Sequence, residues 1–198
     1  QRPAKLKDVI APGDGLSTGR SSLAELRFND GSLFRIGEQA IFQFSPRSRS
    51  FRLNRGTIVL LIPPGRGVTG VQTPNITAAI RGSGLFVRYI PESDTTLVGA
   101  LTDSGIQVTN KDGSQRKTLV AGQMVVIVGN AIDRLYDFDL GTFYETSDIV
   151  QGLDLNQETP VVNNSDAAIK AERTAVGITA VRTETSSAAI AQPHIVGV

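Results

Sequence analysis

The sequence contains no cysteine and no tryptophan, and only one histidine and one methionine occur among its 198 residues. Without cysteine the chain can form neither a disulfide nor a thiolate metal site. A single histidine, His194, cannot build a Ser-His-Asp triad or a typical zinc site. Apolar runs are short as well. The longest, Thr57 to Ile62, has the length of a strand and not the roughly 18 residues of a membrane span. These absences predict a chain that does not span a membrane and carries neither metal nor cofactor.

The chain begins with Gln1 and not with methionine, and its start is basic and polar at Arg2, Lys5 and Lys7. The simplest account is that a leader has been removed, which predicts an exported protein of the periplasm, the cell surface or the extracellular space. A trimmed sequence is the alternative. The lack of cysteine is typical of the bacterial envelope, although a cytosolic protein can lack cysteine too.

Charge is unevenly distributed along the chain, although the net charge is only +1. Residues 1–90 hold 13 Lys/Arg and 5 Asp/Glu, which gives +8, whereas residues 91–198 hold 7 and 14, which gives −7. Three explanations are open: an anionic ligand for the first half, head-to-tail packing of copies, or two solvated faces.

Glycine (20 residues) and proline (9 residues) indicate many turns, as an all-β chain requires. The central stretch, Thr73 to Val87, predicts two short apolar strands that are joined by a bend at residues 81–84, where two glycines allow backbone angles that other residues resist. Asn29 to Ser32 predicts a hairpin with a type I′ turn, because Asp-Gly tolerates positive φ angles. The run Thr57 to Ile62 lacks polar alternation and is predicted as the most buried strand.

A turn, a short strand, a Gly-polar break and an apolar strand occur twice, at residues 29–42 and 110–127. Short strands at near-regular spacing predict a mainly β fold, either a β-solenoid or a sandwich. The C-terminal extension is expected to hold one or two short helices, at residues 142–152 and 167–172, and a strand. The expected division of the chain is an N-terminal extension at 1–12, a β domain at 13–130, an acidic and aromatic connector at 131–155, and a tail at 156–198.

Six segments, in this order, resemble the FecR domain family of bacterial envelope proteins over residues 13–128. They are GDGLSTG, AELRFNDGSLFRIGEQAIFQF, RGTIVLLIPP, VQTPNITAAIRGSGLFVRY, TDSGIQVTN and LVAGQMVVI. The resemblance implies a periplasmic or extracytoplasmic β domain of solenoid character that binds other proteins and performs no catalysis. In the best-known members it passes a siderophore-receptor signal through the membrane to a sigma factor. Stand-alone versions are expected to be envelope scaffolds or adhesion modules.

One short motif raises an enzymatic alternative. Residues 100–105, Ala-Leu-Thr-Asp-Ser-Gly, match the hydrophobic-Asp-Ser/Thr-Gly pattern of aspartic proteases. That chemistry needs two carboxylates that share a proton, so the chain would have to dimerise around Asp103. The sequence has no second such triplet, and the FecR resemblance assigns Asp103 to an ordinary turn between strands. We therefore predict a non-enzymatic protein, with the dimeric protease as an alternative.

A basic segment is the candidate binding site. Its arginines flank an aromatic residue, a pattern that sites for anionic polymers use. In an exported bacterial protein the expected ligand is an anionic glycan or lipopolysaccharide phosphate, and not nucleic acid. Solvated loops are the alternative. The candidate residues are Arg47, Arg49, Phe51, Arg52, Arg55 and Arg66.

Residues 156–198 have too few large apolar side chains to build a core alone. Residues 175–183 have strand character, with Val176, Ile178 and Ala180 on one face. Because such β domains leave sheet edges that accept an added strand, the tail is predicted to dock as a strand on its own domain or on a neighbouring copy. Docking on a neighbour would make the chain a subunit of a homo-oligomer or filament, so the expected partners are proteins, including copies of itself.

Overall fold

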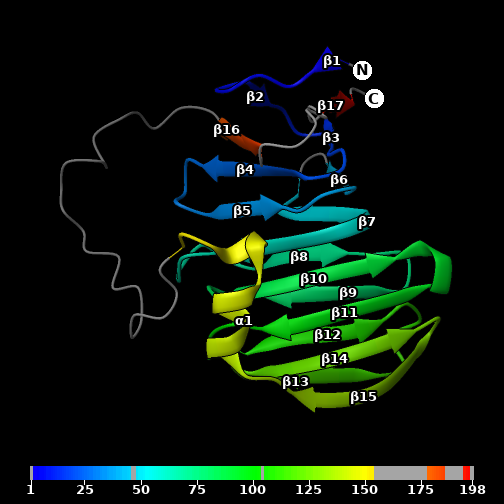
Figure 1. Ribbon diagram of the computed structural model, residues 1–198. Helices are drawn as coiled ribbons and strands as arrows, with labels where there is room; N and C mark the ends of the chain where they lie inside the picture. The colour runs from blue at the N-terminus through cyan, green and yellow to red at the C-terminus, as the bar shows by residue number, and fades with distance from the viewer. Residues whose placement is uncertain (1, 46–47, 104, 154–177, 186–193, 197–198) are drawn as a thin grey trace.

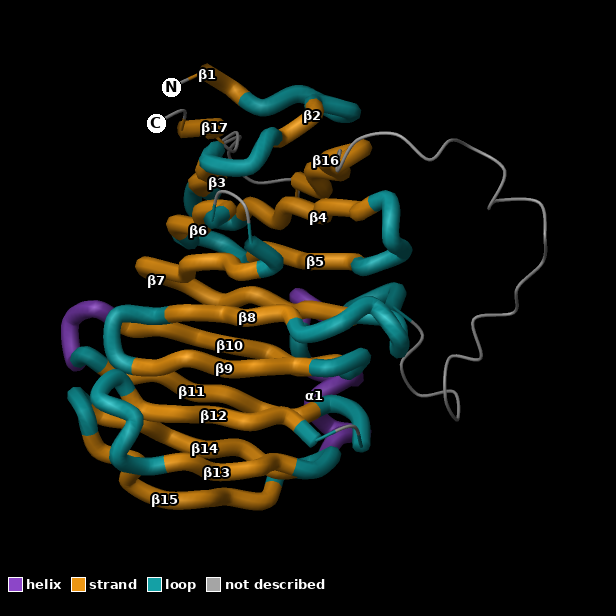
Figure 2. Tube along the Cα trace, turned by 180° about the vertical axis from the view of Figure 1, so that it is seen from behind, coloured by secondary structure: helices purple, strands orange, loops and turns teal. Residues whose placement is uncertain are grey.

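The computed structural model describes residues 2–45, 48–103, 105–153, 178–185 and 194–196. Strands dominate these residues, so the predicted mainly β fold is confirmed, whereas the solenoid label is not. The strands form two layers, called sheet A and sheet B here. Sheet B lies in front in Figure 1 and sheet A lies in front in the reverse view of Figure 2. No helix in the described part of the chain is long and apolar enough to cross a membrane.

The two sheets share the long strand β7 (Ser50–Leu61), whose first half pairs within sheet A and whose second half pairs within sheet B. Sheet A contains, in spatial order, β1 (Arg2–Pro3), β17 (His194–Val196), β3 (Gly15–Ser17), β6 (Ile41–Phe44), the first half of β7, β8 (Thr69–Gln72), β9 (Ile76–Ile80), β12 (Ile106–Asn110) and β13 (Arg116–Leu119). Sheet B contains β2 (Val9–Ile10), β16 (Ile178–Thr185), β4 (Ser22–Phe28), β5 (Leu33–Ile36), the second half of β7, β10 (Gly84–Ile90), β11 (Thr95–Ala100), β14 (Gln123–Val128) and β15 (Ala131–Asp137).

The chain builds these layers by alternating between them. β8 and β9 form a hairpin in sheet A, β10 and β11 form one in sheet B, β12 and β13 form the next in sheet A, and β14 and β15 form the next in sheet B. Each hairpin pairs with the preceding one of its own sheet, β9 with β12 and β11 with β14. Turns that are distant in the sequence therefore lie side by side on the two sides of the stack, where the strands end.

The main core lies between the two sheets and takes alternate residues from each strand. In β9, Ile76, Ala78 and Ile80 are buried there, as the alternation predicted. Leu85 and Val87 of β10 join the same core. Between these strands Gly82 has a φ of +70°, and the chain passes from sheet A to sheet B. The bend predicted from the glycines is thus the point at which the chain changes layer.

The hairpin predicted at residues 29–32 is confirmed, since these residues join β4 to β5, but the predicted turn type is wrong. A type I′ turn needs positive φ at both central residues, whereas of these four residues only Gly31 has one, at +86°. Gly31 N donates to Phe28 O at 3.0 Å. Asp30 Oδ1 accepts a hydrogen bond from Ser32 N at 2.9 Å, which stabilises the turn without a left-handed residue at Asp30.

Residues 57–62 lack alternation because both faces of this part of β7 are covered. Ile58 and Leu60 are fully buried in the main core between the sheets. Val59, which is 1% exposed, faces the opposite way and packs in a second cluster with residues that follow β15. These residues form α1 (Leu140–Thr146) and the single helical turn η2 (Asp148–Val150), where one helix was predicted over 142–152. The other helix, predicted at 167–172, lies outside the described residues.

Candidate interaction site

The outer face of sheet B carries the segment that follows β15. Here Phe86 of β10 stacks on Phe143 of α1, with ring centroids 5.0 Å apart, and meets Phe138 edge-on at 5.8 Å. Gly99 of the neighbouring β11 makes this packing possible, because a Cβ at this position would overlap the Phe86 ring. Tyr144 donates a hydrogen bond to Leu101 O at 3.0 Å, and burial raises the pKa of its hydroxyl. We call residues 138–153 the docked segment.

A buried ion pair anchors the far end of the docked segment. Arg35 Nε lies 3.1 Å from Glu25 Oε2, and the two side chains are only 8% and 5% exposed. Arg35 Nη1 also donates to the backbone carbonyls of Ile149 and Gln151. Arg27, on the solvent side, donates to the other oxygen of Glu25 at 2.8–2.9 Å. Glu25 and Arg35 therefore hold the docked segment in place, although it lies more than a hundred residues further along the chain.

Beside the docked segment an open groove of about 1070 Å³ runs over the remaining outer face of sheet B. Polar and apolar side chains line it in similar measure, and the apolar ones include Phe86, Leu97 and Met124. One wall is the docked segment from Phe143 to Gln151, and the other wall is the turn around η1 (Pro91–Ser93). The groove is the part of this face that the docked segment leaves open.

Arg88 is one of the charged residues that line the groove. It lies on β10, opposite Thr57 of β7 and Leu97 of β11. Its side chain is exposed and forms no ion pair within the described residues. The groove thus offers one uncompensated cation next to apolar side chains.

Three charged residues at the rim of the groove have partners, whereas Asp148, which also lines the groove, forms no ion pair within the described residues. Arg55 Nη2 lies 2.6 Å from Glu92 Oε1, and hydrogen bonds from the Glu92 backbone amide and from Arg55 hold the pKa of Glu92 below its ordinary value. Glu38 accepts a hydrogen bond from Ser21 N at 2.8 Å. These contacts leave Arg88 as the group with the greatest capacity to bind an anion.

The predicted basic segment does not come together as one site. Arg49 forms an ion pair of 2.7 Å with Asp30 and hydrogen bonds of 3.3 Å with Thr69, on the side of the stack where these strands turn. Arg55 is paired with Glu92 instead, and Arg52 lies exposed on sheet A between two buried neighbours. Phe51 is 7% exposed and packs among the core phenylalanines Phe28, Phe34, Phe42 and Phe44. Arg47 lies outside the described residues.

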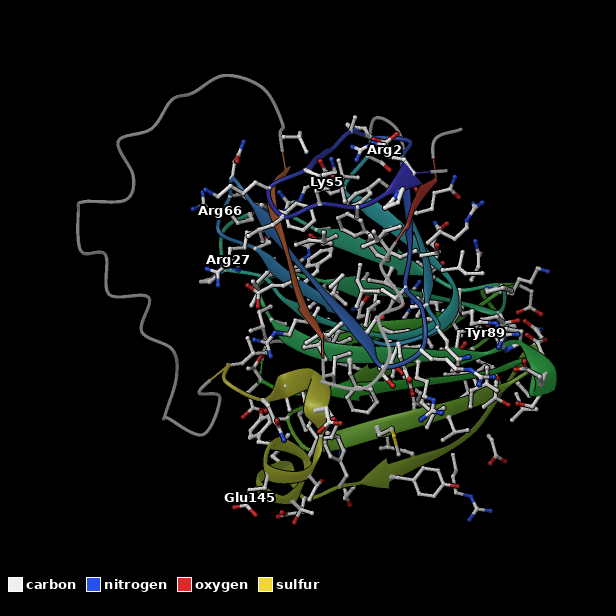
Figure 3. The ribbon with its side chains drawn as sticks, turned by 45° about the horizontal axis from the view of Figure 1, so that its top comes forward. Arg2, Lys5, Arg27, Arg66, Tyr89 and Glu145 are labelled. Atoms are coloured by element: carbon white, nitrogen blue, oxygen red, sulfur yellow. The ribbon has the colours of Figure 1, made fainter. Side chains whose placement is uncertain are left out.

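Two arginines that sequence reasoning missed lie close to Arg49 and Arg66. Arg27 is the last residue but one of β4, near the turn of Gly31, and that turn packs against Pro63, three residues before Arg66. Figure 3 shows Arg27 and Arg66 on one side of the molecule, with Tyr89 on the opposite side. Arg81 precedes Gly82, which lies against Pro64. Anionic glycan binding by the predicted set stays a prediction.

The described strands of the predicted tail pair with the chain's own sheets. β16 lies between β2 and β4, and β17 lies between β1 and β3, as Figures 1 and 2 also show. Ile178 is opposite Ile10 and Phe28, whereas Ala180 falls within a register shift and Val176 lies outside the described residues. Docking of the whole tail, and docking on a neighbouring copy, stay predictions.

Deleting residues 160–198 is expected to lower the melting temperature by about 5 °C or more, because β4 and β3 lose their neighbours and the fully buried Ile10 and Leu16 become exposed. Differential scanning calorimetry measures the change. Val181→Pro, opposite Leu26 in the β16–β4 pair, should reproduce part of the loss. An unchanged melting temperature and assembly size in the deletion variant would contradict the prediction.

The protease alternative finds no support in the placement of Asp103. Its exposed carboxylate accepts a hydrogen bond from Ala121 N at 2.9 Å, so it stabilises the neighbouring turn between β13 and β14. Within the described residues, no group of three or more His, Cys, Asp or Glu side chains is placed to hold a metal ion.

Comparison with known proteins gives a family for the central region. The model of the family described as "FecR protein" matches residues 14–102, which confirms the resemblance for this part of residues 13–128. No curated protein matches the chain.

Two solved structures share the fold. One is the 1.65 Å crystal structure of a candidate anti-sigma factor from Parabacteroides distasonis ATCC 8503, with a TM-score of 0.57 and 11% identity over 67% of this chain. The other is a 2.50 Å structure with the same description and organism, with a TM-score of 0.56 and 12% identity over 70% of this chain. In both cases the match spans 65% of that protein, just under two thirds of its length. At this identity the similarity concerns the fold.

Proposed function

With a FecR domain at residues 14–102 as the premise, we propose that this chain is a non-enzymatic protein-interaction module of the bacterial cell envelope. The main support is the open groove on sheet B beside the docked segment. The structural neighbours, described as candidate anti-sigma factors, support a regulatory role and not a catalytic one.

The groove suits a polypeptide segment better than a small molecule. Its volume of about 1070 Å³ exceeds the ~300–1,000 Å³ of typical small-molecule pockets, and it is open along its length. Leu97 and Met124 offer apolar contact. The guanidinium of Arg88 can donate two parallel hydrogen bonds to one carboxylate. The partner segment is therefore expected to carry an acidic residue beside a bulky apolar one.

A random peptide library displayed on phage tests this proposal. The immobilised 198-residue chain should enrich peptides with an acidic residue next to Leu, Ile, Phe or Trp. Synthetic versions of these peptides should bind the chain in isothermal titration calorimetry. Arg88→Glu should weaken binding about tenfold or more, because an attraction becomes a repulsion within the site.

Arg52→Glu is the matched control, since Arg52 is also exposed but lies on the opposite sheet. It changes the net charge by the same amount and should leave peptide affinity unchanged. Peptides without an acidic residue, or peptides that bind the Arg88→Glu variant as tightly as the original chain, would refute the groove as the interaction site.

Export to the periplasm, the cell surface or the extracellular space is part of the same proposal. Its support is the FecR match, because the resemblance is to a family of envelope proteins, together with the absence of cysteine. A structural role in a homo-oligomer or filament is supported by sheets that accept added strands, as β16 and β17 do here. Glycan binding has weaker support, because Arg49 and Arg55 already pair with carboxylates.

A further inference from the structure

The turns on one side of the stack, where the strands end, form a continuous surface, which we call the loop end. Successive turns are joined by backbone hydrogen bonds, so their order along the stack is fixed. The turn after β7 comes first, then those of β9–β10, β11–β12 and β13–β14, and last the residues after β15. The bonds that join them are Ile62 N to Ser83 O at 2.9 Å, Leu101 N to Gly84 O at 2.8 Å, Gly122 N to Ala100 O at 3.0 Å and Phe138 N to Gly122 O at 2.7 Å.

The first part of the loop end is basic. Its arginines are Arg27, Arg49, Arg66 and Arg81, and all four are exposed. Asp30 is the acidic residue among them. Burial acts to raise the pKa of Asp30, but hydrogen bonds from Ser32 and Arg49 outweigh burial, so the pKa lies below its ordinary value and the carboxylate stays charged. Arg66 and Arg81 form no ion pair within the described residues.

The last part of the loop end is acidic. Its exposed acids are Asp103, Asp137, Asp139 and Glu145, and no Lys or Arg lies among the described residues of these turns. Asp139 caps α1 by accepting a hydrogen bond from Thr142 N at 2.6 Å, which lowers its pKa. In Figure 3, Glu145 lies on the same side of the molecule as Arg27 and Arg66.

From this order of charges we propose that the loop end is a self-complementary interface, in which a second copy of the chain binds about a two-fold axis to form a closed dimer. An axis that runs across the two layers, between the turns at 81–83 and 101–105, reverses the order of the turns in the partner. Each basic turn then faces an acidic turn, and it does so twice, because a two-fold interface repeats every contact.

The matched positions agree in more than charge. About this axis Arg81 comes opposite Asp103, next to the centre of the interface. One turn further out, Val68 comes opposite Val120, and these side chains are 44% and 48% exposed, unusually high for valine. Arg27 and Arg49, which also form ion pairs with Glu25 and Asp30 of their own chain, come opposite Asp137 and Asp139. A polyanion would be attracted to the first half of this surface and repelled by the second, so a copy of the same surface fits better.

The inference rests on the proposed interaction role, but it uses a different surface from the groove. It also differs from the head-to-tail packing suggested by the charge of the two halves. Head-to-tail contact would join the first and last strands of the stack, whereas both charge clusters lie on its side. A two-fold dimer closes, and it does not grow into a filament.

Sedimentation equilibrium of the full 198-residue chain, at several concentrations and salt levels, tests the dimer. The expected result is a monomer–dimer equilibrium that weakens as salt is raised, because salt screens exposed charges. Arg81→Glu should weaken the dimer about tenfold or more, since like charges meet twice in a two-fold interface. Asp103→Arg should do the same, and the double variant should restore dimerisation because the attraction is then reversed but intact.

Arg88→Glu is the control, since it changes the same charge inside the groove and should leave the dimer unchanged. Arg81→Glu should in turn leave peptide binding unchanged. The proposed dimer and the proposed peptide site can therefore be refuted independently of each other. Thermal melts check that each variant is folded. A monomer at every concentration, a mass that keeps growing with concentration, or a double variant that stays monomeric overturns the proposal, as does retention on a polyanion column without self-association.

Discussion

Replacing Gly82 with Ala is expected to lower the free energy of unfolding by about 2–4 kcal/mol, as the sum of backbone strain and a steric overlap. Gly82 has a φ of +70°, which residues with a Cβ rarely adopt. An added Cβ would also overlap the Cα of Pro64, which belongs to the backbone and cannot move aside like the end of a side chain. Urea unfolding followed by circular dichroism gives the free energy.

Gly65 provides the matched control for this substitution. Its φ is +79°, close to that of Gly82, but nothing lies within 4 Å of the position of an added Cβ. Gly65→Ala should therefore cost about 1 kcal/mol, the backbone strain alone. Equal losses in the two variants would mean that the contact between Gly82 and Pro64 does not limit the structure.

Local patterns in the sequence were enough to predict the strands and the point where the chain changes layer. Ile76, Ala78 and Ile80 alternate with less buried residues, and alternation is a property of a single strand. Gly82 marked the bend because its conformational need is also local. The turn type at 29–32 was wrong because the hydrogen bond between Asp30 and Ser32, and not a left-handed Asp30, stabilises that turn.

The described residues of the predicted basic segment do not all lie together, because residues close in sequence can be far apart along an extended strand. Six residues of extended chain separate Arg49 from Arg55, about 20 Å, and Arg55 lies at the point where β7 passes from sheet A to sheet B. Arg81 was missed for the opposite reason. It is far from Arg66 in sequence, but stacking of the turns places Gly82 against Pro64 and brings the two arginines to the same side of the stack.

The groove was not predictable from any single segment. Its residues come from the turns before β4 and after β5, from β10, β11 and β14, and from the docked segment. One indirect signal was present. The run 57–62 has no polar alternation, which requires that something cover its outer face, and the aromatic residues after residue 137 were the available cover. The sequence shows that a cover exists but not how much of the sheet it leaves open.

Replacing Arg35 with Met is expected to destabilise the protein by about 3 kcal/mol or more, because the buried Glu25 carboxylate loses its buried cationic partner. Glu25 would keep only Arg27, whose side chain is 65% exposed. The substitution also removes the donor that binds the carbonyls of Ile149 and Gln151, so the docked segment should detach more often. Chymotrypsin can report this, because Phe138, Phe143 and Tyr144 are potential cleavage sites in that segment.

Two further variants separate loss of the ion pair from loss of packing. Arg27→Met removes the exposed partner of Glu25 and should cost less than about 1 kcal/mol, without faster cleavage of the docked segment. The double variant Glu25→Leu/Arg35→Met replaces the buried pair with apolar groups, so it should recover much of the stability lost in Arg35→Met. Cleavage should stay fast in the double variant, because the donor to Ile149 and Gln151 is still missing. If cleavage is as slow in Arg35→Met as in the original chain, the aromatic contacts of Phe86 and Phe143 alone hold the segment on sheet B.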